Sequence, residues 1–126
     1  MKFSGMRDPQ TNVPLIEIET TDGRLVDLYN ENYLRCVVRR GDDLTFEFDS
    51  WPDRTVRTSL QFRGARDLRT SQPDDWHPGE AEQIEHLLVR GKGPWRRIVF
   101  KAGGLEYEFN SAELRFVVEL APVDAD

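Results

Sequence analysis

Apolar and polar residues alternate with a period of two along the C-terminal part of this chain, from Trp95 to Leu120. The apolar positions are Ile98, Phe100 and Ala102, then Leu105, Tyr107 and Phe109, then Leu114, Phe116, Val118 and Leu120. Successive side chains of a strand point to opposite faces, so this period places each set on one face. The pattern predicts three antiparallel strands with a shared buried face.

The two breaks between these runs suggest a register. Gly-Gly at the first break suits a two-residue turn, because both central residues need positive φ. This turn pairs Phe100 with Tyr107. A four-residue turn at the second break would pair Tyr107 with Phe116 and Glu108 with Arg115. Apolar pairs and opposite charges then coincide, which favours this register over one shifted by a residue.

The same alternation recurs earlier in the chain. Further strands are predicted at Leu15–Glu19, Leu25–Tyr29, Leu34–Val38, Leu44–Phe48 and Val56–Phe62. Asp22-Gly23 is a strong hairpin signal between the first two of these runs. Chain reversals that join strands over short loops are typical of antiparallel sheets, so the N-terminal half also predicts antiparallel pairing.

The turn around Gly41 needs a more particular prediction. A two-residue loop there would place Arg39 opposite Leu44 and mix the two faces. A turn of three or five residues with a bulge would instead keep Val38 opposite Phe46. We therefore expect an odd-length turn. Cys36 would then lie on the apolar face as a buried and unreactive thiol.

The segment from Glu80 to Arg90 fits two structures. Ala81, Ile84 and Leu87 would share one face of a helix, and the composition favours helix. A strand from about Glu85 would instead close a hairpin onto the run that follows Trp95. We favour the strand.

These patterns predict a mainly β fold, namely an antiparallel sandwich or a partly open barrel of about seven to nine strands with at most one short helix. The 126 residues suit a single domain spanning residues 1–126. Residues 1–11 and 121–126 lack periodicity and predict loose ends.

The composition is typical of a soluble protein. Hydrophobic residues make up 38% of the chain and charged residues 32%, and no apolar run approaches the roughly 18 residues of a membrane helix. The segment Met1–Pro9 lacks the apolar core of a signal peptide. Cys36 is the single cysteine and allows no internal disulfide. A cytoplasmic protein without membrane contact is expected.

The net charge of −6 argues against general affinity for nucleic acid, which rewards a basic face. The charge is unevenly distributed, because no Lys or Arg occurs between Arg69 and Arg90. That stretch contains Asp74, Asp75, Glu80, Glu82 and Glu85. A solvated loop is the ordinary meaning of such a run. The alternative is an acidic surface that binds a basic protein.

Two tryptophans lie outside the alternating runs. Trp76 falls inside the acidic stretch, and Trp51 falls in the loop after the Leu44–Phe48 strand. Each could fold back to cover an end of the sheet. Each could also anchor a partner protein, since Trp is enriched at binding hot spots. The predicted partner surface therefore combines both tryptophans with the five carboxylates.

Few residues suggest a catalytic, metal-binding or phosphate-binding site. His77 and His86 share no ligand spacing with Cys36, so no metal site is predicted. No phosphate-binding glycine loop or nucleophile motif occurs, and no catalytic residue or cofactor is predicted. Arg63, Arg66 and Arg69 could bind a phosphate, but a salt-bridged face is the expected role.

Four short motifs support a family resemblance: Asp27-Leu28-Tyr29-Asn30, Asp43-Leu44-Thr45-Phe46, Leu60-Gln61-Phe62-Arg63-Gly64 and Gly104-Leu105-Glu106-Tyr107. With them the chain from Leu15 to Leu120 resembles small mainly-β bacterial proteins of unknown function, some of which lie beside toxin genes and look like immunity proteins. The resemblance implies a non-enzymatic protein that occludes a partner, and it transfers no catalytic residue.

A second function class stays open beside this one. The chain could be a small-molecule binder or an enzyme that uses the mouth of a barrel. A large apolar cavity with a few polar groups would favour that class. A solid core with an exposed acidic and aromatic patch would favour the protein-binding class.

Overall fold

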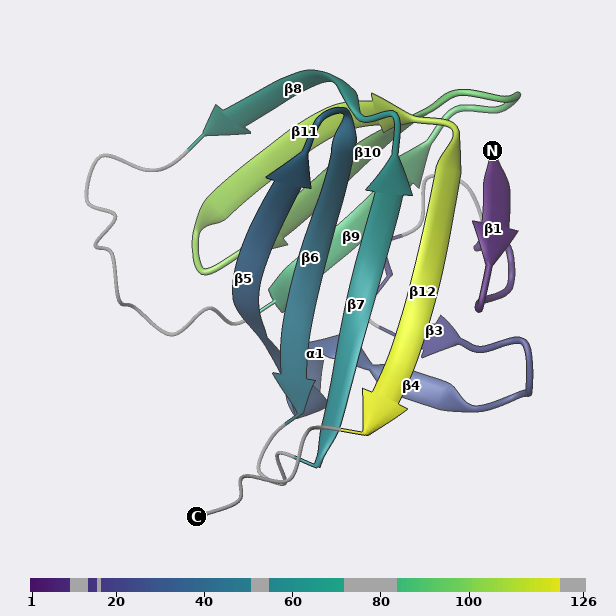
Figure 1. Cartoon of the computed structure of the whole chain (residues 1–126), viewed down its shortest axis with the longest axis vertical. Coiled ribbons are helices and arrows are strands. Elements are labelled where there is room, and N and C mark those ends of the chain that lie inside the picture. The colour runs from purple at the N-terminus through teal and green to yellow at the C-terminus, as the bar shows by residue number, and fades with distance from the viewer. Residues whose placement is uncertain (10–13, 16, 51–54, 72–83, 121–126) are drawn as a thin grey trace.

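Two five-stranded sheets pack face to face in the computed structural model, which describes residues 1–9, 14–15, 17–50, 55–71 and 84–120 (Figure 1). In chain order the elements are β1 (Lys2–Ser4), β2 (Pro14–Leu15), β3 (Glu17–Glu19), β4 (Leu25–Asp27), α1 (Leu28–Glu31), β5 (Asn32–Arg40), β6 (Asp43–Ser50), β7 (Val56–Arg63), β8 (Arg66–Ser71), β9 (Ile84–Arg90), β10 (Arg96–Ala102), β11 (Leu105–Ser111) and β12 (Glu113–Leu120). Among these residues no helix has the length and apolar composition needed to cross a membrane.

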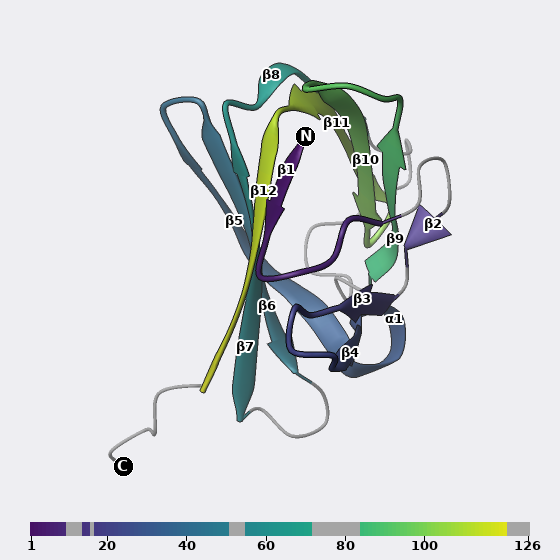
Figure 2. The same cartoon turned by 90° about the vertical axis from the view of Figure 1, so that its right-hand side faces the viewer.

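The front sheet has the strand order β1-β12-β7-β6-β5, and the back sheet has the order β2-β9-β10-β11-β8. The strands β3 and β4 form a separate two-stranded ribbon. Figure 2 shows the two sheets edge-on, with the ribbon and α1 below the back sheet. The predicted mainly β fold with at most one short helix is confirmed. The strands exceed the expected number because several are only two or three residues long.

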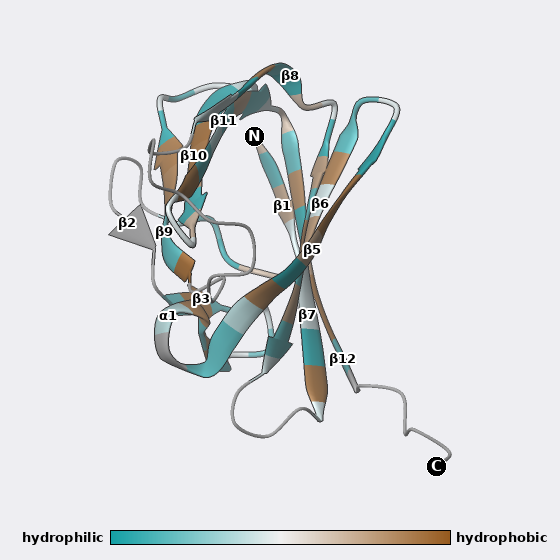
Figure 3. Cartoon of the chain, turned by 90° about the vertical axis from the view of Figure 1, so that its left-hand side faces the viewer, coloured by the Kyte–Doolittle hydropathy of each residue, from teal (hydrophilic) through white to brown (hydrophobic). Residues whose placement is uncertain are grey.

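An aromatic cluster joins the sheets. The Phe46 ring centroid lies 4.5 Å from that of Phe100, 5.2 Å from Tyr107, 6.0 Å from Phe62 and 6.2 Å from Phe109. The four phenylalanines are fully buried. Hydrophobic residues, brown in Figure 3, occur along the strands of both sheets, and the buried ones form a single core cluster. Large rings in mutual contact fill the space between the sheets, so the described sheets form a packed sandwich rather than a closed barrel.

Two predicted pairings are confirmed. The β10–β11 hairpin turns at Gly103-Gly104 and places Phe100 opposite Tyr107. Residues Ile84–Arg90 form the strand β9, which pairs with β10 and places Leu87 opposite Phe100. The alternation therefore located both strands and their buried face correctly.

The predicted pairing of the last two runs is wrong. Phe116 lies opposite Leu60 of β7 in the front sheet, whereas Tyr107 lies opposite Thr70 of β8 in the back sheet. Glu108 and Arg115 therefore lie in different sheets. The Glu108 carboxylate forms an ion pair with Arg97 instead.

The chain crosses between the sheets at Ser111. This residue is fully buried, and its hydroxyl lies 3.0 Å from the carbonyl oxygens of both Arg63 and Glu113. A strand with one apolar face can cover the core from either sheet, because the core lies between them. Alternation therefore fixes the buried face of β12 but does not identify its neighbours.

The predicted turn around Gly41 is also wrong. Arg40 lies opposite Asp43 across a two-residue turn, and Arg39 lies opposite Leu44. The irregularity occurs instead inside β5, between Leu34 and Cys36. This bulge changes the face of the residues that follow it, so the faces are corrected within the strand rather than in the turn.

The predicted loose end at residues 1–11 includes residues 10 and 11, which lie outside the described residues, but Lys2–Ser4 form the strand β1. β1 pairs in parallel with the start of β12, with Ser4 opposite Arg115. Gly5 follows at φ 77°, and a Cβ there would collide with the carbonyl oxygen of Phe116. β1 therefore stops at Ser4, and the chain turns toward the β3–β4 ribbon, where Met6 bridges Thr20. Residues 121–126 lie outside the described residues.

Phe109→Ala tests the packing of the sandwich. The substitution empties a fully buried site that contacts Phe46 and Phe62, so the free energy of unfolding should fall by about 3–5 kcal/mol. Chemical denaturation would measure the loss. Leu25→Ala is the control, because Leu25 is 66% exposed and its replacement should change stability by less than about 0.5 kcal/mol. Equal losses in the two variants would contradict the described core.

Candidate functional site

Most of the predicted partner surface lies outside the described residues. This applies to Asp74, Asp75, Trp76, Glu80, Glu82 and Trp51. Glu85 is described: it is exposed on β9, and its carboxylate lies 3.8 Å from the ammonium of Lys101. The prediction that these residues form one surface therefore stays a prediction.

The described residues nevertheless locate both ends of the acidic segment 72–83. Ser71 lies opposite Glu106, and Ile84 lies opposite Ala102. Both ends therefore flank the Gly103-Gly104 turn of the back sheet. Trp51 belongs to the connection between β6 and β7, so it is attached to the front sheet instead.

The charge of the chain is concentrated outside the described part. Seven of the 23 acidic residues, but only one of the 17 basic residues, fall in the ranges that the structure leaves undescribed. The described sandwich is therefore neutral in formal charge, and the net charge of −6 belongs to the remaining ranges. Four of those seven acidic residues lie in segment 72–83.

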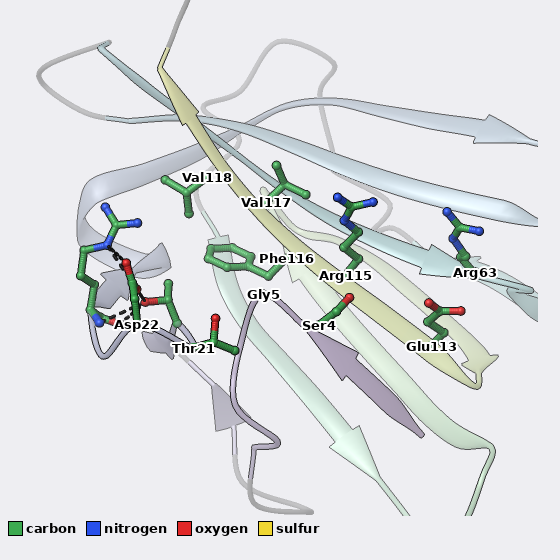
Figure 4. Close-up of a pocket in the computed structure, with 12 residues that line it drawn as sticks. Ser4, Gly5, Thr21, Asp22, Arg63, Glu113, Arg115, Phe116, Val117 and Val118 are labelled. Carbon is green, nitrogen blue, oxygen red and sulfur yellow. Dashed lines mark hydrogen bonds and ion pairs between the residues drawn. The ribbon is translucent and has the colours of Figure 1, made fainter.

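A groove of about 560 Å³ runs along β12, which we call the β12 groove (Figure 4). Ser4 and Gly5 line it between the chain around Asp22 in the β3–β4 ribbon and Glu113 at the start of β12 (Figure 4). Phe116 and Val118 supply the apolar part of its lining. No periodic pattern in the sequence predicts this groove, because its walls come from segments far apart in the chain.

The ribbon side of the β12 groove is held by local hydrogen bonds. The N–H of Thr20 donates to the Arg24 carbonyl at 2.8 Å, and the N–H of Arg24 donates to the Thr20 hydroxyl at 3.0 Å. The Thr20 hydroxyl also bonds to the Asp22 carboxylate, and this bond is the main cause that lowers the pKa of Asp22. Asp22 in turn holds the Arg24 guanidinium at 3.1 Å. The wall is thus ordered before any ligand arrives.

Two arginines of the groove differ from Arg24. Arg63 and Arg115 are exposed, and neither makes an ion pair with any other residue that the structure describes. In Figure 4 both side chains rise from the same side of the sheet, with Ser4 beside Arg115. Glu113 lies opposite Arg63 and lines the same part of the groove, so two arginines and one carboxylate leave a formal charge of +1 there.

A second depression of about 310 Å³ adjoins the β12 groove and shares Arg24 and Val118 with it. Asn32 and Thr58 belong to its lining. Asn32 donates its amide N–H to the Asp27 carbonyl at 2.8 Å. The Asn32 Oδ1 and the Thr58 hydroxyl are both buried and find no hydrogen-bond partner among the residues that the structure describes. Unsatisfied buried polar atoms are costly, so this end of the sandwich is less well satisfied than its core.

Charged side chains on the outer face of the front sheet are mutually paired. The Asp49 carboxylate lies 3.3 Å from the Arg57 Nε and 3.6 Å from the Arg35 Nε, and the Tyr33 hydroxyl donates to it at 3.4 Å. Glu47 binds Arg35 at 2.7 Å. These contacts satisfy the carboxylates in the folded state, so the cluster has a structural role.

The predicted arginine group does not form one site. Arg66 stacks over the Trp95 ring at 4.4 Å, Arg69 lies opposite Glu108, and Arg63 lines the β12 groove. Within the described residues, no three His, Cys, Asp or Glu side chains gather in a metal-like cluster.

Cys36 is half-buried on the outer face rather than buried in the core as predicted. The bulge in β5 turns it outward, and its thiol donates to the Glu47 carboxylate at 2.9 Å. Partial burial, followed by the Glu47 contacts, raises the pKa of the Cys36 thiol. The expected low reactivity therefore has a different cause from the one predicted.

Glu47→Gln tests that cause. Removing the carboxylate should lower the pKa of Cys36, because a neighbouring negative charge disfavours the thiolate. At pH 8 the rate of alkylation by iodoacetamide should then rise severalfold, as followed by mass spectrometry. Glu119→Gln, on an exposed site of the same sheet, should leave the rate unchanged. An unchanged rate in Glu47→Gln would mean that Glu47 does not control the thiol.

Comparisons with protein-family models, with curated proteins and with solved structures found no match for this chain. Functional inference therefore rests on its own residues and geometry.

Proposed function

We propose that this chain is a non-enzymatic protein-binding module whose partner is basic, in the manner of an immunity protein that occludes a toxin. The observation that carries the proposal is the distribution of charge. The described sandwich is formally neutral, whereas segment 72–83 contains Asp74, Asp75, Glu80 and Glu82 and no basic residue. Glu85 continues this acidic stretch onto β9.

The attachment of the segment supports the proposal. Its ends at Ser71 and Ile84 flank the Gly103-Gly104 turn, so the charges are tethered to one end of a rigid sheet. A fixed tether limits the entropy lost when the segment meets a partner. Localised charge of one sign also raises association rates over a Debye length of about 8 Å at physiological salt.

The filled core supports recognition at the surface. Aromatic rings of both sheets meet around Phe46 at centroid distances of 4.5–6.2 Å. Close-packed rings leave the middle of the sandwich to side chains rather than to a ligand. The β12 groove and the depression beside it lie at one edge and one end of the front sheet, and a third depression, lined by Val38, Thr45 and Gln61, lies on the front sheet across β5, β6 and β7.

Neutralising Asp74, Asp75 and Glu82 together, to Asn, Asn and Gln, should mainly slow association with the partner. A partner would first be captured from the source cell at low salt and then used in surface-based binding kinetics. The association rate should fall severalfold at low salt and approach the parent rate at moderate salt, because screening removes the same attraction.

The matched control neutralises three carboxylates on the sandwich, namely Glu17, Glu31 and Asp42. All three are exposed and make no ion pair with another described residue, so this variant has the same net charge. If both triple variants associate equally slowly, net charge rather than segment 72–83 steers the partner. If the first variant associates as fast as the parent at low salt, the segment is a solvated loop and the proposal fails.

Trp76→Ala should mainly change the rate constant of dissociation. A tryptophan buried at an interface contributes short-range contact that is lost on dissociation, so the dissociation rate should rise about tenfold or more while the association rate changes little. Trp95→Ala is the control, because Trp95 is described, exposed and attached to the opposite end of β10. Equal effects of the two substitutions would remove Trp76 from the interface.

A further inference from the structure

The depression that adjoins the β12 groove, which we call the ribbon depression, has a volume of about 310 Å³. One wall is the front sheet, where Thr58 lies opposite Val118. The other wall is the β3–β4 ribbon, which contributes Leu25 and Val26, and Figure 2 shows the ribbon facing the lower half of the front sheet. The volume is within the usual range of small-molecule sites.

Two polar side chains of this lining are buried over more than nine-tenths of their surface, because Asn32 is 7% exposed and Thr58 is 3% exposed. The Asn32 Nδ2 donates to the Asp27 carbonyl at 2.8 Å, which fixes the amide and leaves Oδ1 as its unused atom. Oδ1 can only accept a hydrogen bond. The Thr58 hydroxyl also has no partner among the described residues. Buried polar atoms normally have partners, so this pair points to a donor that the described chain does not supply.

Glu31 gives the ribbon depression its charge. It is exposed at the end of α1, directly before Asn32, and makes no ion pair with another described residue. Arg24 is the one basic side chain among the described residues of the lining, and the Asp22 carboxylate holds its guanidinium at 3.1 Å. Glu31, Arg24 and Asp22 together carry a formal charge of −1, which favours a cationic ligand.

Neighbouring charges do not reverse this balance. Asp27, whose carbonyl binds the Asn32 amide, adds a further carboxylate beside the ribbon depression. Arg57 and Glu119 lie opposite one another on the outer face of the front sheet, and the Arg57 Nε lies 3.3 Å from the Asp49 carboxylate. Arg57 therefore faces away from the depression with its charge already paired.

The rest of the lining is aliphatic. Val26, Val56 and Val118 are half-buried, and Leu25 is 66% exposed at the start of β4. An apolar stem that covered these side chains would gain from their removal from water. Acceptors at one side and aliphatic groups at the other therefore call for a ligand with a donor-rich cationic head and an apolar stem.

We propose that the ribbon depression binds a primary ammonium group on a short aliphatic stem, which is either a free alkylamine or a lysine side chain. An ammonium has three N–H donors and no acceptor. It would donate to the Asn32 Oδ1, the Glu31 carboxylate and the Thr58 hydroxyl. The stem would contact Val56 and Val118.

The ribbon wall would shift to admit this head group, since the Asn32 Oδ1 and the Thr58 hydroxyl are shielded in the free protein. β4 is three residues long and pairs only with β3 among the described strands. A ligand that supplies the missing donor interacts more strongly with the shifted arrangement, and this difference in interaction drives the shift.

The ribbon depression does not include segment 72–83, so this proposal does not rest on the function proposed above. The variant in which Asp74, Asp75 and Glu82 are neutralised should bind amines as the parent does. Loss of amine binding should likewise leave the association rate with a basic partner unchanged.

The probe is pentylamine, titrated into the full chain at pH 7 and followed by NMR. The side-chain amide signals of Asn32 should shift, with a Kd of about a millimolar for so small a ligand. Trimethylpentylammonium keeps the charge and the stem but has no N–H, and it should bind about tenfold more weakly. Pentanol, which lacks the charge, should also bind more weakly.

Acetyl-lysine methylamide, acetylated on its α-nitrogen, distinguishes the two sources of the ammonium. Tighter binding than pentylamine would identify a lysine side chain as the ligand. Binding of pentylamine alone would identify a free amine. Both results support the site, whereas shifts that are equal for pentylamine and its trimethyl analogue would overturn it.

Two substitutions complete the test. Thr58→Val keeps the shape and deletes an unsatisfied hydroxyl, so it should raise the Tm while lowering the affinity for pentylamine severalfold. Glu31→Gln changes an exposed residue and should also lower this affinity severalfold, whereas Glu17→Gln, an exposed control outside the lining, should not. Parent-like affinity in both Thr58→Val and Glu31→Gln would overturn the proposal.

Discussion

Packing around the Phe46 ring is the interaction on which the rest of the structure depends. Its ring contacts Phe62 from its own sheet and Phe100, Tyr107 and Phe109 from the other, at centroid distances of 4.5–6.2 Å. Each sheet alone would expose its apolar face to water, so each needs the other to bury that face. This shared layer fixes the spacing of the sheets, so the ribbon, the groove and the end of the back sheet have defined positions around it.

The sequence predicted local structure well because burial imposes a period of two. It located the β10–β11 hairpin at Gly103-Gly104 and correctly favoured a strand over a helix at Ile84–Arg90. It failed for β12 because alternation specifies which face is buried and not which strand lies beside it. The buried hydroxyl of Ser111, which marks the crossing between sheets, has no periodic signature.

The two candidate binding regions differ in how far the sequence could predict them. The acidic segment can be recognised from the sequence alone, because no Lys or Arg occurs between Arg69 and Arg90. The β12 groove cannot be recognised in this way, because it requires the sheet exchange at Ser111 and the early end of β1 at Gly5. Positive φ at Gly5 turns the chain away from β12 and is the local cause of the early end of β1.

Among the described residues β12 pairs with β7 along its whole length but with β1 only as far as Arg115, and amide hydrogen exchange tests this pairing most directly. The N–H of Lys2 donates to the Ala112 carbonyl, so residues 114, 116 and 118 direct their backbone groups toward the β1 side and residues 113, 115, 117 and 119 direct theirs toward β7. The N–H of Val117 is directed toward β7 and should exchange slowly, whereas the N–H of Val118 is directed toward the groove and should exchange much faster. The same alternation should give a slow amide at Glu119. Val118 protection equal to that of Val117 would mean that the edge is already covered, and the account would be wrong.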